Sequence, residues 1–150
     1  MTATANVVSQ RRSAWKNADL HLLTAAILLV NLPLWMGGSA AGLFAFLPGL
    51  VAQGEWWRVF THLFAHISFY HLLLDAGAFL MLYHGLRDVV PVGGRLGLCA
   101  GAAIGSLALA SLSPSFVLQG LCGLSGTAHG LMAVSGLLTA RSEDPVQRRV

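Results

Sequence analysis

The amino-acid sequence predicts an all-α bundle of membrane-spanning helices. Of its 150 residues, 55% are hydrophobic and only 10% are charged, and the mean hydropathy is +0.68. About a quarter of the residues in a soluble domain are charged, so this composition argues against a soluble globular protein. Two stretches, 20–54 and 96–140, contain no Asp, Glu, Lys or Arg. Such stretches are typical of helices that cross a bilayer, each of which needs about 20 apolar residues.

The basic residues indicate how this bundle is oriented. The net charge of +3 does not form a nucleic-acid surface, because four spans with both chain ends on one side place every basic residue except Arg58 on that side. By the positive-inside rule, that side is cytoplasmic. We therefore expect an integral membrane protein, of the bacterial inner membrane, with a cytoplasmic N-terminus. Its expected partners are the lipid bilayer and membrane proteins, not nucleic acid.

Four spans and one long outer loop account for the chain in order. The predicted elements are a cytoplasmic tail at 1–19, spans at about 20–36, 68–86, 95–112 and 125–140, an outer loop at 37–67, and a cytoplasmic segment at 141–150. The spans and the loop together form one domain, 20–140.

The outer loop is expected because residues 37–67 stay largely apolar but are interrupted. Gly37-Gly38 and Pro48-Gly49 break the helical pattern, and Trp56 and Trp57 suit the headgroup level of a membrane. Non-helical backbone at that depth must be buried against protein. We therefore expect this loop to be partly sunk into the interface.

The second half of the chain divides at the polar segment 111–115, which separates the third span from the fourth. Small residues recur at every fourth position in both spans. They are Gly97, Gly101 and Gly105 in the third span and Gly126 and Gly130 in the fourth. Such spacing lets helices pack closely in lipid, so we expect these glycines to face neighbouring helices.

Ser125 is the first candidate for chemistry. It lies in the run Gly-Leu-Ser-Gly-Thr-Ala-His-Gly (123–130), at the expected start of the fourth helix. Flanking glycines let another backbone approach, and a helix N-terminus offers free N–H groups to a developing oxyanion. A serine in a membrane helix also commonly caps the helix or bonds back to a carbonyl, so Ser125 alone leaves both interpretations open.

A second polar cluster lies upstream and contains His62, His66, His71 and Asp75. Residues 71 and 75 share one helix face. A carboxylate at mid-span costs about 2.5 to 3.5 kcal/mol on insertion scales, so it must pair with a donor or be protonated. The pair could fix helix packing instead. Zinc binding is the chemical rival, but the Glu of a His-Glu-x-x-His motif is absent.

His129 lies one helical turn after Ser125. A base in that position could activate the hydroxyl. Neighbouring positions on one helix rarely aim both groups at a shared carbonyl, however, so we expect a supporting role.

Together these residues resemble the rhomboid family of intramembrane serine proteases. The resemblance extends from the segment Trp-Arg-Val-Phe-Thr-His-Leu-Phe-Ala-His-Ile-Ser-Phe-Tyr-His-Leu-Leu-Leu-Asp (57–75) to Gly-Leu-Ser-Gly (123–126). The His-Gly that follows is similar to the rhombosortase branch, whose members are thought to process proteins with a C-terminal Gly-Gly-type sorting tail.

The resemblance implies a role for each candidate residue. Ser125 would be the nucleophile, and Gly123 would keep its approach open. His71, the residue at position 75 and the Ser125 backbone N–H would bind the oxyanion. The supporting residues would be Trp57 and Arg58 in the loop, His62 and His66 beside the loop and a water path, and His129 at an aromatic position. A serine protease supplies its own nucleophile, so no metal and no cofactor are expected.

Two departures from the family pattern qualify this function. Rhomboids usually have Asn where this chain has Asp75, and their general base is a histidine on a sixth span. We therefore expect the chain to be truncated after the fourth of a probable six helices. The predicted function is an intramembrane serine endopeptidase acting on membrane-anchored proteins. The alternatives are an inactive relative that binds transmembrane helices and, less favoured, a histidine-rich metal or proton-handling protein.

Overall fold

The computed structural model describes residues 17–141, so most of the predicted tail and nearly all of the segment 141–150 lie outside the described residues. Its helices are α2 (Ala18–Val30), α3 (Leu32–Trp35), α4 (Ala40–Phe44), α5 (Pro48–Ala52), α6 (Arg58–Thr61), α7 (Phe69–Gly85), η1 (Leu86–Asp88), α8 (Val92–Ala110), α9 (Phe116–Gln119) and α10 (Ser125–Arg141). In the described part, the one β-type contact is an isolated bridge between Phe46 and Leu121. The all-helical fold predicted from the sequence is confirmed.

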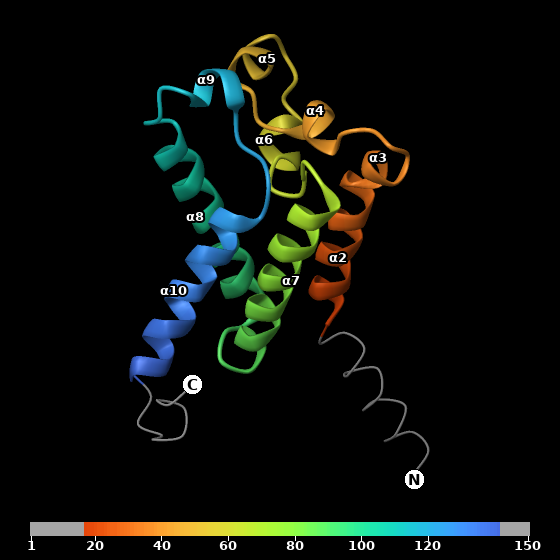
Figure 1. The fold of residues 1–150 in the computed structure, drawn as a ribbon. Coiled ribbons are helices and arrows are strands. Elements are labelled where there is room, and N and C mark those ends of the chain that lie inside the picture. Colours follow the sequence, from red (N-terminus) through yellow and green to blue (C-terminus); the bar gives the residue numbers. More distant parts are fainter. Residues whose placement is uncertain (1–16, 142–150) are drawn as a thin grey trace.

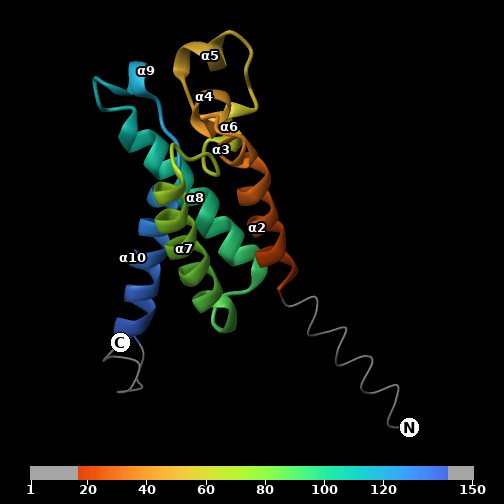
Figure 2. The same cartoon turned by 45° about the vertical axis from the view of Figure 1, so that its right-hand side comes forward.

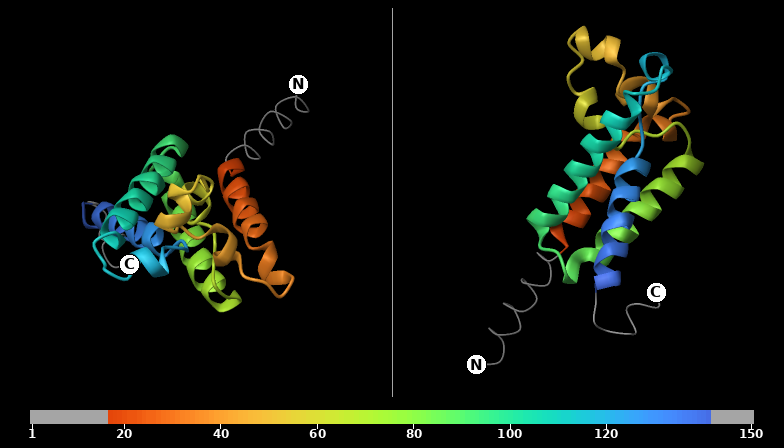
Figure 3. Two further views of the ribbon diagram at one scale, coloured as in Figure 1. Left: turned by 90° about the horizontal axis from the view of Figure 1, so that it is seen from above. Right: turned by 90° about the vertical axis from the view of Figure 1, so that its left-hand side faces the viewer.

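The four longer helices lie alongside one another, and α3–α6 and α9 gather at one end of the bundle (Figures 1 and 2). We call this the loop end. Helix α10 packs against α8 and α7, and α2 packs against α7. Seen from above, α7 therefore lies between α2 and the α8–α10 pair (Figure 3). Helices α7 and α10 both begin at the loop end, so their N-terminal turns lie near the same short helices.

Large apolar side chains point away from the bundle. Leu22, Met81, Ile104 and Leu109 are each at least 70% exposed. Lipid removes the penalty that water would impose on such surfaces. By length and composition, one of the described helices, α8, qualifies to cross a membrane, whereas α2 is apolar but shorter. The count of four spans therefore stays a prediction.

The first predicted span, 20–36, is divided in the structure at Asn31, where α2 ends and α3 begins. Asn31 is fully buried. Its side-chain amide donates to the carbonyls of Ile27 (2.7 Å) and Phe64 (2.6 Å), and its Oδ1 accepts from the His66 backbone N–H (3.0 Å). The break therefore has a physical reason: one side chain joins the end of α2 to the segment that precedes α7.

The loop at 37–67 is organised around Arg58, which is 4% exposed. Its guanidinium donates to the carbonyls of Ala45 (2.9 Å) and Gly42 (3.2 Å) and pairs with Glu55 (2.6 Å). A buried charge is tolerated only when its donors are satisfied in this way. Arg58 therefore holds α4 and α6 together.

At the opposite end of the bundle, Asp19 joins three helices. Its Oδ2 accepts from the Tyr83 hydroxyl (2.5 Å) and from Arg95 Nη2 (2.5 Å), and the guanidinium lies 5.0 Å from the Tyr83 ring centre. Tyr83 and Arg95 are 1% and 2% exposed. Besides the side of the membrane that its charge indicates, Arg95 therefore has a packing role between α2, α7 and α8.

Of the two glycine series, the one on α10 allows close helix packing in the described part of the chain. A Cβ added to Gly126 or Gly130 would overlap Ser106 or Ala102 of α8, so these glycines allow α10 to approach α8 closely. The expectation for the third span was wrong within the described part of the chain: Cβ atoms at Gly97, Gly101 and Gly105 would meet no atom within 4 Å. The small residues that α8 offers to α10 are an alanine and a serine.

Candidate active site

Two helix starts position the candidate residues. Ser68 caps α7, and its hydroxyl accepts from the His71 backbone N–H (3.2 Å), so His71 lies in the first turn and Asp75 one turn later. Helix α10 begins at Ser125 itself. Both helices start at the loop end, and Asp75 of α7 contacts the first residue of α10.

The segment before α10 is fixed to the loop by backbone bonds. Phe46 and Leu121 exchange two N–H···O bonds of 2.9 and 3.0 Å, and the Gly123 N–H donates to the His62 carbonyl (2.9 Å). His62 is 2% exposed, and burial lowers the pKa of its imidazole. The neutral ring contacts the Arg58 carbonyl through Nδ1 (3.1 Å). His62 therefore contributes to the site through its backbone and its packing.

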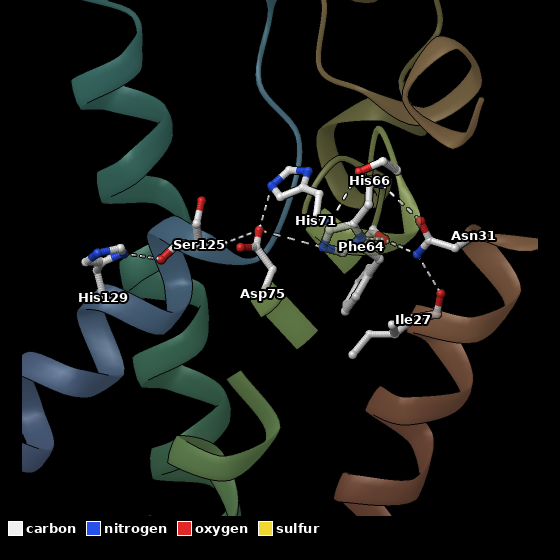
Figure 4. Close-up of polar contacts among 9 residues, drawn as sticks. Ile27, Asn31, Phe64, His66, His71, Asp75, Ser125 and His129 are labelled. Carbon is white, nitrogen blue, oxygen red and sulfur yellow. Dashed lines mark hydrogen bonds and ion pairs between the residues drawn. The ribbon is translucent and has the colours of Figure 1, made fainter. Parts of the chain in front are cut away.

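Asp75 lies at the centre of the candidate site (Figure 4). Its Oδ2 is 3.0 Å from His71 Nε2 and accepts a hydrogen bond from the Ser125 backbone N–H at 3.2 Å. His66 Nε2 lies 3.8 Å from the same oxygen. The structure thus brings together His71, Asp75 and Ser125, which are separated by up to 54 positions in the sequence.

Gly123 provides the room for this contact. A Cβ at this position would lie 2.7 Å from Asp75 Oδ2 and 3.1 Å from His71 Cε1. Its φ of +99° is also a conformation that residues with a side chain rarely adopt. Steric room and backbone conformation both require glycine here.

His66 is fully buried, and burial lowers the pKa of its imidazole. Its Nδ1 lies 2.9 Å from the Phe64 carbonyl, which requires the hydrogen of the neutral ring to be on Nδ1. Nε2 is then an acceptor; it has no hydrogen-bond partner and faces Asp75. Sequence reasoning missed Asn31, which holds the His66 backbone; a lone amide within an apolar run was the available signal.

The other predicted supporting residues lie away from the Asp75 contact. His129 Nδ1 is 2.7 Å from the Ser125 backbone carbonyl, so this exposed ring bonds to the backbone of the serine (Figure 4). The Trp57 indole N–H lies 3.4 Å from the Leu43 carbonyl and belongs with Arg58 to the loop. Within residues 17–141, no group of three or more His, Cys, Asp or Glu side chains is placed to hold a metal ion.

A comparison with protein families decides what this arrangement belongs to. The Rhomboid domain model matches residues 53–148, which include both the His71–Asp75 segment and the Ser125 segment. The chain belongs to the rhomboid family. Neither a curated protein nor a solved structure matched the chain. Membership of this family makes the chain an integral membrane protein and relates it to the intramembrane proteases.

Proposed function

We propose that this rhomboid-family protein is a serine endopeptidase that cleaves membrane-anchored protein substrates, with Ser125 as the nucleophile. The observation that carries the proposal is that Asp75 Oδ2 contacts both the Ser125 backbone N–H, at the N-terminus of α10, and His71 Nε2. Backbone N–H groups at a helix start and a nearby imidazole are donors that can stabilise a tetrahedral intermediate.

The chemistry would be acyl transfer. The Ser125 hydroxyl attacks the substrate carbonyl, its proton passes to a base, and the amine leaves before water releases the acyl group. The Ser125 N–H and His71 would stabilise the oxyanion, and removing one such donor typically costs about 10²- to 10³-fold in rate. Neither nearby histidine is placed as the base in this structure, since His129 bonds to the Ser125 carbonyl and His71 bonds to Asp75.

The bundle would cross the membrane with its loop end outward. Helices α2, α7, α8 and α10 would supply the four spans, which places the N-terminus in the cytoplasm. Arg87, Arg95 and Arg141 would then lie on the cytoplasmic side, and Arg58, which is in the loop, would lie on the other side. The positive-inside rule supports that orientation, and a bacterial inner membrane would fit it. The His-Gly after the serine motif supports the rhombosortase branch and processing of C-terminal sorting tails.

One observation favours a second candidate, an inactive rhomboid-like protein that binds transmembrane helices. Asp75 accepts the Ser125 N–H, the same donor that an oxyanion would need. An ionised carboxylate only accepts hydrogen bonds and cannot itself stabilise the oxyanion. In the described residues, the metal-binding alternative finds no ligand set.

The two candidates differ in the effect of Ser125→Ala. The full chain is reconstituted in liposomes with a model substrate that has one transmembrane helix, and cleavage is followed on gels. Removing the nucleophile should reduce cleavage by about 10⁴-fold or more, to background. Ser111→Ala is the matched control, because that exposed hydroxyl bonds only to the Ala108 carbonyl.

Cleavage that survives Ser125→Ala would contradict the proposal. If the wild-type protein does not cleave but can be crosslinked to the substrate helix, and Ser125→Ala leaves that crosslinking unchanged, the inactive binder is the correct function.

A further inference from the structure

The position beside the Ser125 N–H that a substrate oxyanion would need is taken by a side-chain oxygen of the protein itself. Asp75 Oδ2 lies 3.2 Å from the Ser125 N, 3.0 Å from His71 Nε2 and 3.8 Å from His66 Nε2. An anionic oxygen beside a helix N-terminus and an imidazole is the arrangement that a tetrahedral intermediate requires. In this structure, a side-chain oxygen takes that position.

We propose that Asp75 is a built-in inhibitor of the site: its carboxylate occupies the oxyanion-binding donors, and its protonation frees them. This inference rests on the proposed protease function. While Asp75 is ionised, the Ser125 N–H is engaged and a second negative charge would develop beside the first. Like charges at this separation repel, so the ionised form opposes the reaction at the step where the oxyanion forms.

The proton has a defined place to go. A proton from water that binds to Asp75 Oδ2 converts the carboxylate into a hydroxyl donor. One free acceptor is His66 Nε2, 3.8 Å from Asp75 Oδ2, which is buried, has no hydrogen-bond partner and carries no hydrogen in the neutral ring. The new O–H can turn toward it. The carboxyl then accepts more weakly, and the Ser125 N–H is released to a substrate oxygen.

The titratable groups around Asp75 are histidines and a cysteine. His71 faces it from the same helix, and His66 faces it from the segment before α7. Cys122 is the titratable group on the segment before α10, and within α10 itself His129 bonds to the Ser125 carbonyl instead. Among the described residues, neither Lys nor Arg forms an ion pair with Asp75. The groups that hold the carboxylate are therefore a backbone N–H and histidines, and no permanently charged side chain.

The first test measures the Ser125 amide and does not depend on activity. The full chain is labelled with ¹⁵N-serine in detergent micelles, the Ser125 signal is assigned by its loss in Ser125→Ala, and its shift is followed from about pH 3 to pH 8, a range that covers the titration of ordinary carboxylates and imidazoles. An amide bound to a carboxylate should report the titration of that carboxylate. We expect the signal to shift with pH in the wild type and to lose the component that comes from the carboxylate in Asp75→Asn, which keeps only the smaller effect of the neighbouring histidines. Asp88→Asn is the matched control, since Asp88 contacts only the exposed Arg87, and it should titrate like the wild type.

The second test measures reactivity of the serine with a fluorophosphonate probe. An asparagine can donate its N–H₂ where the carboxylate could only accept. Asp75→Asn should therefore react at least about tenfold faster than the wild type at neutral pH. This is less than the about 10²- to 10³-fold in rate that one oxyanion donor typically contributes. The ratio of the two rates should fall toward one as the pH is lowered. Taking the ratio removes the pH dependence of the base, which both proteins share.

Each outcome separates the inference from the function on which it rests. A Ser125 amide that does not titrate in the wild type overturns the inference, and so does Asp75→Asn reacting no faster than Asp88→Asn. If Asp75→Asn does not fold, the titration of the Ser125 amide in the wild type alone still tests the inference. If the amide titrates but Ser125 reacts with the probe in no variant, Asp75 does hold the amide and the protease function fails.

Discussion

Replacing Gly123 with alanine should damage both the stability and the geometry of the site. The new Cβ would lie 2.7 Å from Asp75 Oδ2, whereas ordinary contacts begin near 3.4 Å, so the carboxylate must retreat by about 0.7 Å. The Asp75–Ser125 contact, now 3.2 Å, would lengthen beyond a hydrogen bond. Holding alanine at a φ of +99° costs about 1 to 2 kcal/mol, and overpacking costs about 1 to 3 kcal/mol more.

The expected loss is therefore about 2 to 5 kcal/mol in the free energy of unfolding. It can be measured by unfolding the protein with SDS in mixed micelles, followed by far-ultraviolet circular dichroism. Gly136→Ala is the matched control on α10, because a Cβ there meets no atom within 4 Å. That substitution should stabilise the helix by about 0.5 to 1 kcal/mol. Equal stability of the two variants would refute the packing argument at Gly123.

Two further predictions use the same unfolding assay. Asp19→Ala leaves the Arg95 guanidinium buried and unpaired, so it should lower the free energy of unfolding by about 3 to 5 kcal/mol. Asp88→Ala removes an exposed pair and should lower it by less than about 1 kcal/mol. Similar losses in the two variants would contradict the packing role of Arg95. Burial lowers the pKa of His62 and His66, so the unfolded chain binds protons at these positions more readily than the folded one. Stability should therefore be full above about pH 6.5 and should decrease as the pH falls below it, and a flat or opposite dependence would count against neutral buried rings.

The sequence predicted features that depend on local spacing. The positions of α7, α8 and α10 follow from apolar runs and their interruptions, since a helix needs an uninterrupted stretch of sequence. The shared face of His71 and Asp75 follows from the helical repeat. The place of Ser125 at a helix start follows from the glycines around it.

Features that depend on distant partners could not be predicted in the same way. Asn31 breaks the first predicted span because its partners lie 33 and 35 positions away. Arg95 and Asp19 pair across 76 positions. The spacing of charges indicated a side of the membrane but not a neighbour. The hydrogen bond from the Ser125 N–H to Asp75 joins residues 50 positions apart. Residue 75 was expected to help bind the oxyanion, whereas its carboxylate accepts a hydrogen bond from the backbone donor that the oxyanion would need.

Two half-buried carboxylates, Asp19 and Asp75, differ in what they can do: one is structural and the other is available for chemistry. Asp19 and Asp75 each receive two close donors from neighbouring elements. The donors to Asp19 include a guanidinium, which is always protonated, so the charge is compensated at every physiological pH. The close donors to Asp75 are a backbone N–H and an imidazole, and among the described residues no guanidinium pairs with it. A carboxylate held only by these two donors next to a candidate nucleophile is therefore the one available to the chemistry of the site.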